Sequence, residues 1–359
     1  MTVYCEHRLG KLCKRFSSGK GISAEKITQI GHYPVIGGNG LRGFTEAYNF
    51  DGECAVIGRQ GAYCGNVQFF SGKGYMTEHA VVAEPNDDNN AKYLAYKLGG
   101  LQLGRFSGQA AQPGLSVTKL ARLRIEMPAK KYQDQVAEIL SAYDDLIEVN
   151  NKRIKVLEQM AENRYKEWFV RFRFPGHETA EFENGIPGGW KVGHLLDEMT
   201  FSSGKAKPQE EGMIPVYGGN GITDWCDRYN NADVVIIGRV GAYCGAVYYE
   251  PDKCWISDNA LFAKSKRKES LTQYYNYFLL KSLRLNLFQG GTGQPLITQG
   301  FLSKIRVVVP SSKIVNYYCN TVKPLFELLQ KIKDQNLNLI KQRDLLLPRL
   351  MSGKLEVHA

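Results

Sequence analysis

The apolar positions of this chain follow two periods that alternate along the sequence. In each half, short apolar runs end in turn residues, a pattern typical of buried β-strands. These runs are residues 53–57 and 124–128 in the first half and residues 233–237 and 306–310 in the second. Residues 91–103 and 272–287 lie between them and have helical character. Each half therefore predicts a unit of mixed α and β structure.

After each unit the period changes. Apolar residues recur at spacings of four and three from Val136 to Trp168, and no Gly or Pro interrupts residues 132–168. Residues 325–350 repeat this pattern. Such spacing predicts a coiled-coil seam between two helices of about 55–60 Å each, at about 1.5 Å per residue. The predicted seam positions are Leu140, Ile147, Asn150, Ile154, Leu157, Leu329, Ile332, Asn336, Leu339 and Leu346.

These helices have two possible partners. Antiparallel pairing with each other would put the two mixed units at opposite ends of a rod with pseudo-two-fold symmetry, whereas each helix could instead pack on its own unit. The helix length favours pairing, because helices this long overhang a domain of about 100–150 residues. Asn150 and Asn336 would then fix the register at some cost in stability. Pro324 is expected to start or kink the second helix and Pro348 to end it.

The two halves are copies of one another. Residues 57–65 read Ile-Gly-Arg-Gln-Gly-Ala-Tyr-Cys-Gly, and residues 237–245 repeat eight of these nine positions, with Val240 in place of Gln60. Other segments match in the same order, at offsets of 180–185 residues. This period is too long for a solenoid and indicates a duplicated domain. The matched segments are 17–20 with 202–205, 33–40 with 214–221, 77–80 with 257–260, and Gln112-Pro113 with Gln294-Pro295.

The predicted fold class is therefore α+β, with two duplicated mixed α/β domains separated by an antiparallel coiled coil of two long helices. We predict a first domain at 1–130, a central long helix at 131–170, a linker at 171–188, a second domain at 189–311, and a C-terminal helix and tail at 312–359.

Composition adds a class of partner. The net charge of +10 suggests a polyanion, nucleic acid before membrane, or else a protein that merely has a high pI. The eight cysteines form no Cys-x-x-Cys pair and have no His at zinc spacing, which favours reduced buried thiols in a cytoplasmic protein and no metal site. The first residues carry no apolar run and no 18-residue apolar stretch occurs, so neither a signal peptide nor a membrane span is expected.

The sequence lacks the motifs of common nucleic-acid enzymes. It has no phosphate-binding Gly-x-x-x-x-Gly-Lys-Ser/Thr loop, no Asn/Asp-Pro-Pro-Tyr methylation motif and no acidic pair followed by Glu-x-Lys. His79 is the one histidine in a repeated segment, and its counterpart is Asn259. We therefore predict no catalytic residue and no bound cofactor.

The nonapeptide instead favours binding, because Arg and Tyr side chains stand among glycines that let a backbone approach closely. Since both copies keep Arg and Tyr, these residues are expected to be structural or to position phosphates. Base readers are expected where the copies differ, although such loops can also be merely divergent. The candidate DNA-binding residues are Lys20, Asn39, Arg42, Arg59, Gln60, Tyr63, Lys73, Gln109, Lys205, Asn220, Thr223, Trp225, Arg228, Arg239, Tyr243 and Lys253. The positions expected to read bases are Arg42, Thr45, Lys73 and Gln109 in the first copy and Thr223, Asp224, Trp225, Arg228 and Lys253 in the second.

In these features the chain resembles the specificity subunit of type I restriction–modification systems, over nearly its whole length. The resemblance rests on the order and duplication of the motifs. They are the two nonapeptides, Pro-Val-Tyr-Gly-Gly-Asn-Gly-Ile at 215–222, Trp-Ile-Ser-Asp-Asn-Ala at 255–260, the linker sequence at 167–177 and the ending at 346–355. The first copy departs from the pattern where Glu78-His79 replaces Asp258-Asn259.

The resemblance implies two target-recognition domains, each reading one half of a bipartite, asymmetric site in double-stranded DNA, with the helices setting the gap. It implies two modification subunits, which bind S-adenosylmethionine and methylate adenine, docked on the helices, and motor–nuclease restriction subunits. The chain itself would be a non-catalytic, cytoplasmic subunit. Half-sites about 34 Å apart would face the same side of DNA.

Two other functions remain open from the residues. The chain could be a non-catalytic protein-binding scaffold whose duplicated domains sit on a coiled-coil rod. It could also be an enzyme with an unrecognised site, such as a methyltransferase fused to recognition domains, which the missing cofactor motif disfavours.

Overall fold

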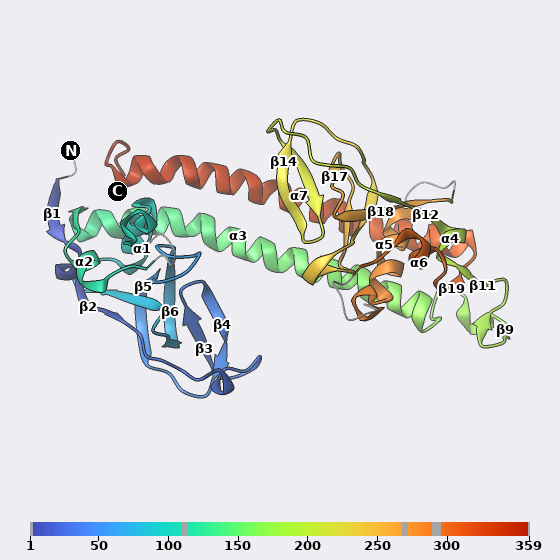
Figure 1. The fold of residues 1–359 in the computed structure, drawn as a ribbon, viewed down its shortest axis with the longest axis horizontal. Helices are drawn as coiled ribbons and strands as arrows, with labels where there is room; N and C mark the ends of the chain where they lie inside the picture. The colour runs from blue at the N-terminus through green and yellow to red at the C-terminus, as the bar shows by residue number, and fades with distance from the viewer. Residues whose placement is uncertain (1–2, 109–113, 268–271, 289–295, 358–359) are drawn as a thin grey trace. The chain divides into compact units, whose positions relative to one another are not determined.

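The computed structural model describes residues 3–108, 114–267, 272–288 and 296–357 (Figure 1). The chain divides into two compact units. The first unit comprises Met1–Asn150 with Asp334–Ala359, and the second comprises Asn151–Lys333. The two long helices each contribute one half to each unit.

The first unit is built on a six-stranded sheet in the order β2-β7-β5-β6-β3-β4, drawn in blue shades in Figure 1. Its neighbours are antiparallel except for the parallel pair β3 and β6. A separate two-stranded ladder joins β1 to β8. The strands are β1 (Tyr4–Arg8), β2 (Cys13–Ser18), β3 (Tyr33–Gly37), β4 (Gly40–Thr45), β5 (Phe50–Gly58), β6 (Val67–Met76), β7 (Ala80–Pro85) and β8 (Arg124–Pro128).

The central strand β5 has both faces covered, which explains its continuous apolar run. Ala55 and Ile57 lie in the core cluster that contains the helix α1 (Ala91–Gly100). Cys54 and Val56, on the other face, pack against Ile36 of β3 and Phe50. The strands predicted at 53–57 and 124–128 are confirmed. The helix predicted at 91–103 ends at Gly100 and is followed by a 3₁₀ turn, Leu103–Phe106.

Side chains cap the N-termini of two helices in the first unit. Asn90 begins α1, because its side chain accepts a hydrogen bond from the backbone N–H of Tyr93. Ser116 does the same for the short helix α2 (Val117–Ala121) through Lys119.

The second unit repeats this plan with one break. Its sheet is divided into a four-stranded part, β12-β18-β15-β16, and a three-stranded part, β14-β13-β17. The single strand β6 of the first unit corresponds to two pieces here, β16 (Val247–Glu250) and β17 (Trp255–Ile256). Pro251 follows β16 directly and has no N–H to donate to a ladder, which explains the interruption.

The remaining elements of the second unit frame these sheets. The helices are α4 (Leu195–Glu198), α5 (Thr272–Ser282), α6 (Gln299–Ser303), and 3₁₀ turns at Gly241–Tyr243 and Leu285–Phe288. The strands are β9 (Phe182–Glu183), β10 (Ile186–Pro187), β11 (Lys191–His194), β12 (Met199–Ser203), β13 (Ile214–Gly218), β14 (Gly221–Cys226), β15 (Val234–Gly238), β18 (Ala260–Ser265) and β19 (Arg306–Val309). The strands predicted at 233–237 and 306–310 are therefore confirmed to within one residue at each end.

The two long helices are α3 (Lys130–Tyr165), which continues as a π-helical turn at Lys166–Val170, and α7 (Ser312–Met351). In the first unit they run antiparallel. Asn150 donates to Asn336 at 2.9 Å, and further along Arg343 donates to Asp144 at 2.6 Å. In the second unit the pairing is also antiparallel, since the Tyr318 hydroxyl donates to the Ala161 carbonyl at 3.2 Å.

The alternatives for helix packing are both realised in part. The first turns of α3 enter the core of the first unit through Val136 and Leu140, and those of α7 enter the core of the second through Val315 and Val322. Beyond these turns, the helices pair with each other through seam residues. Asn150, Leu329, Ile332 and Asn336 are buried there, whereas the predicted seam residue Leu140 is buried in the core of the first unit. Ile147, Ile154, Leu157, Leu339 and Leu346 are half-buried.

The two prolines do not mark the ends of the second helix. α7 begins at Ser312, well before Pro324, and passes Pro348 to end at Met351. Pro324 lacks an N–H, and nearby the Arg164 guanidinium donates to the carbonyl of Thr321 at 3.4 Å. Past Pro348, the hydroxyl of Tyr132 holds the last turn by donating to the carbonyl of Leu350 at 3.1 Å.

The segment predicted as a linker is ordered. It carries the small β9–β10 hairpin, and Phe174 stacks on Trp190 with ring centroids 5.2 Å apart. Among the described residues, no helix combines the length and the apolar character needed to cross a membrane.

Candidate nucleic-acid interface

The repeated nonapeptide forms a tight turn in which main chain packs on main chain; we call residues 57–65 and 237–245 the glycine frames. A Cβ placed on Gly58 would lie 2.4 Å from the carbonyl oxygen of Tyr63 and 2.5 Å from that of Gly38. A Cβ on Gly65, where φ is +86°, would lie 2.1 Å from the backbone nitrogen of Gly104. Only glycine fits such positions. Gly238 and Gly245 meet the equivalent atoms in the second unit.

The arginine of each frame joins two loops through its backbone. Arg59 donates its N–H to the carbonyl of His79 at 2.9 Å, and its own carbonyl accepts from Leu115 at 2.9 Å. In the second unit Arg239 makes the same two bonds with Asn259 and Ile297, at 3.1 and 3.0 Å. These bonds explain why both copies keep the segment.

The arginine side chains are half-buried. Arg59 donates to the hydroxyl of Ser18 at 3.3 Å. The Nε atom of Arg239 is buried and has no hydrogen-bond partner within the part of the chain that the structure describes. Both side chains thus lie partly inside the frame, and the tyrosines reach solvent, with Tyr63 52% and Tyr243 53% exposed.

The one difference between the frames has a structural counterpart. The Oε1 of Gln60 lies 3.0 Å from the Nδ1 of His79, at hydrogen-bond distance. Val240 and Asn259 occupy the equivalent positions, and a valine side chain cannot form that bond. The two repeated segments therefore diverge together at positions that touch.

In each unit, a half-buried asparagine clamps the end of a strand. Asn49 donates through Nδ2 to the carbonyl of Met76 at 2.9 Å and accepts from the Met76 N–H at 2.7 Å. The same carbonyl accepts from the backbone N–H of Lys20 at 2.9 Å. In the second unit Asn230, Ile256 and Lys205 form the same three bonds, at 3.0, 2.9 and 3.0 Å.

Sequence reasoning missed Asn49 and Asn230. The signal that could have found them is the dipeptide Tyr48-Asn49, which recurs as Tyr229-Asn230 within the duplicated region. The residue before each asparagine is an exposed tyrosine, 45% for Tyr48 and 51% for Tyr229.

Most predicted DNA-binding residues lie at the surface. Gln109 lies outside the described residues, as do Gln112, Pro113, Gln294 and Pro295. Thr45 is buried, at 6% exposure, and Asp224 is half-buried and ion-paired with Lys207. Arg228 is paired with Glu210 and Asp227. The exposed candidates are Lys20, Asn39, Arg42, Gln60, Tyr63, Lys73, Lys205, Asn220, Thr223, Trp225, Arg228, Tyr243 and Lys253.

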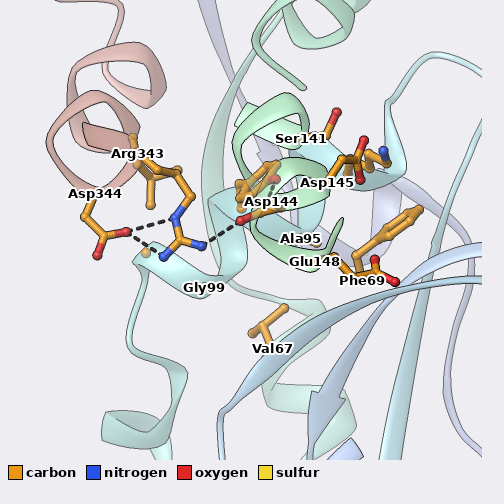
Figure 2. Close-up of a pocket in the computed structure, with 14 residues that line it drawn as sticks. Val67, Phe69, Ala95, Gly99, Ser141, Asp144, Asp145, Glu148, Arg343 and Asp344 are labelled. Carbon is orange, nitrogen blue, oxygen red and sulfur yellow. Dashed lines mark hydrogen bonds and ion pairs between the residues drawn. The ribbon is translucent and has the colours of Figure 1, made fainter. Parts of the chain in front are cut away.

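The first unit also holds a recess of about 430 Å³ between β6, α1, α3 and α7 (Figure 2). Arg343 stands at its edge with its guanidinium between Asp344 and Asp144, and the hydroxyl of Tyr96 donates to Asp144. Burial, and then this bond, raises the pKa of Tyr96. The second unit has a recess of about 280 Å³ at the equivalent place, lined instead by aromatic rings such as Tyr249, Tyr274 and Phe326.

The cysteines are free thiols, and five of the eight are buried. Burial raises the pKa of Cys54, Cys254 and Cys319 to about 12, so these side chains are protonated and unreactive at neutral pH. Cys64 and Cys244 donate to the carbonyls of Arg59 and Arg239 within the frames, at 3.4 and 3.2 Å. Among the described residues, no group of three or more His, Cys, Asp or Glu side chains could hold a metal ion.

Comparison with known proteins agrees with the duplication. The family model for the type I restriction modification DNA specificity domain matches the chain twice, over residues 4–159 and 187–342. The specificity subunit of the Escherichia coli type I restriction enzyme EcoprrI is 40% identical over 142 residues, which is 38% of this chain and 35% of that protein. The specificity subunit of the Methanocaldococcus jannaschii type I restriction enzyme MjaIX is 27% identical over 307 residues, which is 76% of this chain and 71% of that protein.

The chain therefore spans about a third of the first of these relatives and about 70% of the second. A solved structure shares the fold. The S subunit of the type I restriction–modification system from M. genitalium superposes with a TM-score of 0.64, covering 97% of this chain and 96% of that one at 18% identity.

Proposed function

The chain belongs to the type I restriction–modification DNA specificity family, and from this we propose that it is the DNA-specificity subunit of a type I complex, with each recognition domain reading one half of a bipartite site. The observation that carries the proposal is the duplicated glycine frame, with the same main-chain bonds around Arg59 and Arg239. Two copies of one binding element suit a site of two halves. The different loops beside them suit two different half-site sequences.

We assign the readers to exposed residues where the copies differ. In the first unit these are Arg42 and Gln60, and in the second Thr223, Trp225 and Arg228. The frames and their arginines are assigned to building the surface and meeting phosphates, because elements shared by both domains cannot tell different bases apart.

The long helices are proposed to set the spacing between the half-sites and to dock two modification subunits. An exposed apolar stripe on α3 supports docking. Leu146 (39%), Val149 (49%), Val156 (57%) and Met160 (50%) are exposed, at spacings that lie on one helix face. Large exposed apolar side chains at helical spacing favour a partner helix.

The chain is proposed to act without catalysis and without a bound cofactor of its own. Methyl transfer from S-adenosylmethionine to adenine would belong to the modification subunits and DNA cleavage to motor–nuclease subunits. In this scheme the complex works on DNA in the cytoplasm, and the chain's net charge of +10 suits a DNA partner.

The test is methylome sequencing of cells that express the chain with a modification subunit. The expected result is one methylated bipartite motif that disappears when the chain is omitted. Methylation without a motif, or an unchanged motif without the chain, would refute the proposal. If the chain bound the modification subunit but no DNA motif were methylated, a protein-binding scaffold would be favoured instead. Transfer of methyl groups by the chain alone would favour an enzyme.

The spacing role has its own test. A heptad inserted into α3 after Asn150 and another into α7 before Asn336 should lengthen the gap between half-sites and leave both halves unchanged. If the half-sites changed and the gap did not, the helices would not set the spacing.

A further inference from the structure

A lysine lies over a tyrosine ring at the same place in both units. The Nζ of Lys73 is 4.9 Å from the ring centroid of Tyr48, and the Nζ of Lys253 is 4.6 Å from that of Tyr229. Each tyrosine directly precedes the clamping asparagine, Asn49 or Asn230. Each lysine lies three residues before the clamped residue, Met76 or Ile256. We call these groups, with Lys20 and Lys205, the clamp sites.

The contact persists although the surrounding structure has diverged. In the first unit Lys73 lies within the ten-residue strand β6, whereas Lys253 lies between the separate strands β16 and β17. The flanking residues also differ, Gly72 and Gly74 against Asp252 and Cys254. A contact that both units make from different local structures calls for a cause beyond the packing of one strand.

A second lysine is tied to the same strand in each unit. The N–H of Lys20 binds the carbonyl of Met76, and the hydroxyl of Tyr75 donates to the carbonyl of Gly21 at 2.9 Å. In the second unit the N–H of Lys205 binds Ile256, and the indole N–H of Trp255 donates to the Lys205 carbonyl at 3.2 Å. Different aromatic residues thus tie the backbone of the second lysine, or of the residue after it, to the segment that holds the clamped residue.

The charges of the clamp sites are available to a ligand. The Lys73 side chain is 47% exposed, and its carboxylate neighbour Asp51 lies 3.9 Å away and is 57% exposed. A pair this long and this exposed is weak, so an anion can replace it. The tyrosine ring holds the flexible lysine stem in one direction, which lowers the entropy cost of ordering it on binding.

We propose that each clamp site is a phosphate-binding site for the DNA backbone, with Lys73 on Tyr48 and Lys20 in the first unit, and Lys253 on Tyr229 and Lys205 in the second. This inference rests on the proposed DNA-binding function and deepens it. Because the two sites are alike, they cannot distinguish two half-sites. They position each domain on the duplex while divergent residues read bases.

The test measures the salt dependence of binding, using the full chain in complex with modification subunits. Two DNA duplexes are compared: one contains the motif that methylome sequencing identifies, and the other has a scrambled sequence. Lys73→Met with Lys253→Met removes two charges and keeps the stems. The slope of log K against log salt should fall in magnitude by about 1.8, or about 0.9 per phosphate contact. The ratio of wild-type to variant affinity should therefore narrow about twelvefold between 50 and 200 mM salt, equally on both duplexes.

Three further variants separate the causes. Lys73→Arg with Lys253→Arg keeps the charge and should keep the slope. Tyr48→Leu with Tyr229→Leu should weaken binding about two- to fivefold per site at an unchanged slope, because it removes orientation and not charge. Arg122→Gln with Lys304→Gln is the matched control, since these exposed cations also recur in both units, after α2 and α6, but lie over no tyrosine ring within the described residues. It should change the slope little.

If the methionine variants left the slope of log K against log salt unchanged, the proposal would be overturned. It would also be overturned if the control variants lowered the slope equally, because the effect would then come from the net charge of the chain. No effect of the leucine pair would overturn the orienting role of the rings. If the wild-type complex showed no preference for its motif duplex, the proposed function would fail instead. A wild-type preference with an unchanged methionine slope would refute the clamp sites alone.

Discussion

The steric closure of the glycine frame makes Gly58→Ala the most informative single change in the first unit. A Cβ there would meet the Tyr63 and Gly38 carbonyl oxygens at 2.4 and 2.5 Å, whereas ordinary contacts lie at 3.4–4 Å. The turn would have to open by about 1 Å on two sides. It is held shut on both flanks, because Gly58 donates to Asn66 and accepts from Gly65, each at 2.8 Å.

Overpacking costs about 1–3 kcal/mol and occasionally more. With two backbone oxygens in the way and no flexible side chain to yield, we expect the upper end, about 3 kcal/mol. That is a large part of the roughly 5–15 kcal/mol that stabilises a domain. Urea unfolding would measure the loss, and hydrogen exchange should show faster exchange around residues 57–66 and 79–80 in the first unit.

Two other glycines provide matched controls. Among the described residues, none lies within 4 Å of a Cβ added to Gly61, but its φ is +79°, so Gly61→Ala should cost about 1–2 kcal/mol of left-handed strain. Gly99, inside α1, has open space and an ordinary φ, so Gly99→Ala should stabilise the unit by about 0.5–1 kcal/mol. If Gly58→Ala cost no more than Gly61→Ala, the frame would not be sterically closed and the reasoning would fail.

Three further predictions concern the helices and the second unit. Asn336→Leu should cost about 1–3 kcal/mol in urea unfolding, because it removes a hydrogen-bond partner of the buried Asn150. The double variant Asn150→Leu with Asn336→Leu should recover most of this lost stability, and a double variant less stable than the single one would contradict the prediction. Arg267→Met should cost about 3–5 kcal/mol in urea unfolding, because it leaves the 5%-exposed Glu198 without its ion-pair partner. Arg228→Met, which breaks an exposed pair, should cost much less, and equal losses would count against the role of burial. Burial raises the pKa of Glu162, but the hydrogen bonds and charges of Lys166 and Lys281 outweigh burial and leave the pKa below its usual 4.5. The stabilisation from the Glu162 carboxylate is therefore present above pH 4.5 and is lost as the pH falls further. Glu162→Gln should flatten the dependence of stability on pH below pH 4.5 and not above it.

The duplication and the strands could be predicted because each leaves a local, repeating signal. Residues 53–57 are apolar at every position but the first, and β5 is buried on both faces. Pro324 does not start α7, because the turns before it are held by the core of the second unit, through Val315 and Val322.

Sequence reasoning proposed the four lysines of the clamp sites but not the asparagines and tyrosines that they meet. Asn49 bonds to Met76, and Lys73 lies over Tyr48, across 27 and 25 residues of sequence respectively. A single asparagine leaves no repeating pattern in the sequence, and a lysine near a tyrosine is common in any sequence. Only the topology, which sets β6 beside the segment before β5, brings these residues together.

The Gln60 difference is where the frame itself bears on recognition. Gln60 touches His79, and their counterparts Val240 and Asn259 both differ, so one contact accounts for both changes. If the pair is a unit, Gln60→Val with His79→Asn should be less destabilising than the sum of the two single changes, by about 0.5–1 kcal/mol in a double-mutant cycle. Additive losses would mean that the positions vary independently, and Gln60 would then be a free reader. Because the frame backbone is the same in both units, a coupled result would mean that Gln60 and His79 act as one unit in recognition, while the frame backbone holds the neighbouring loops in place.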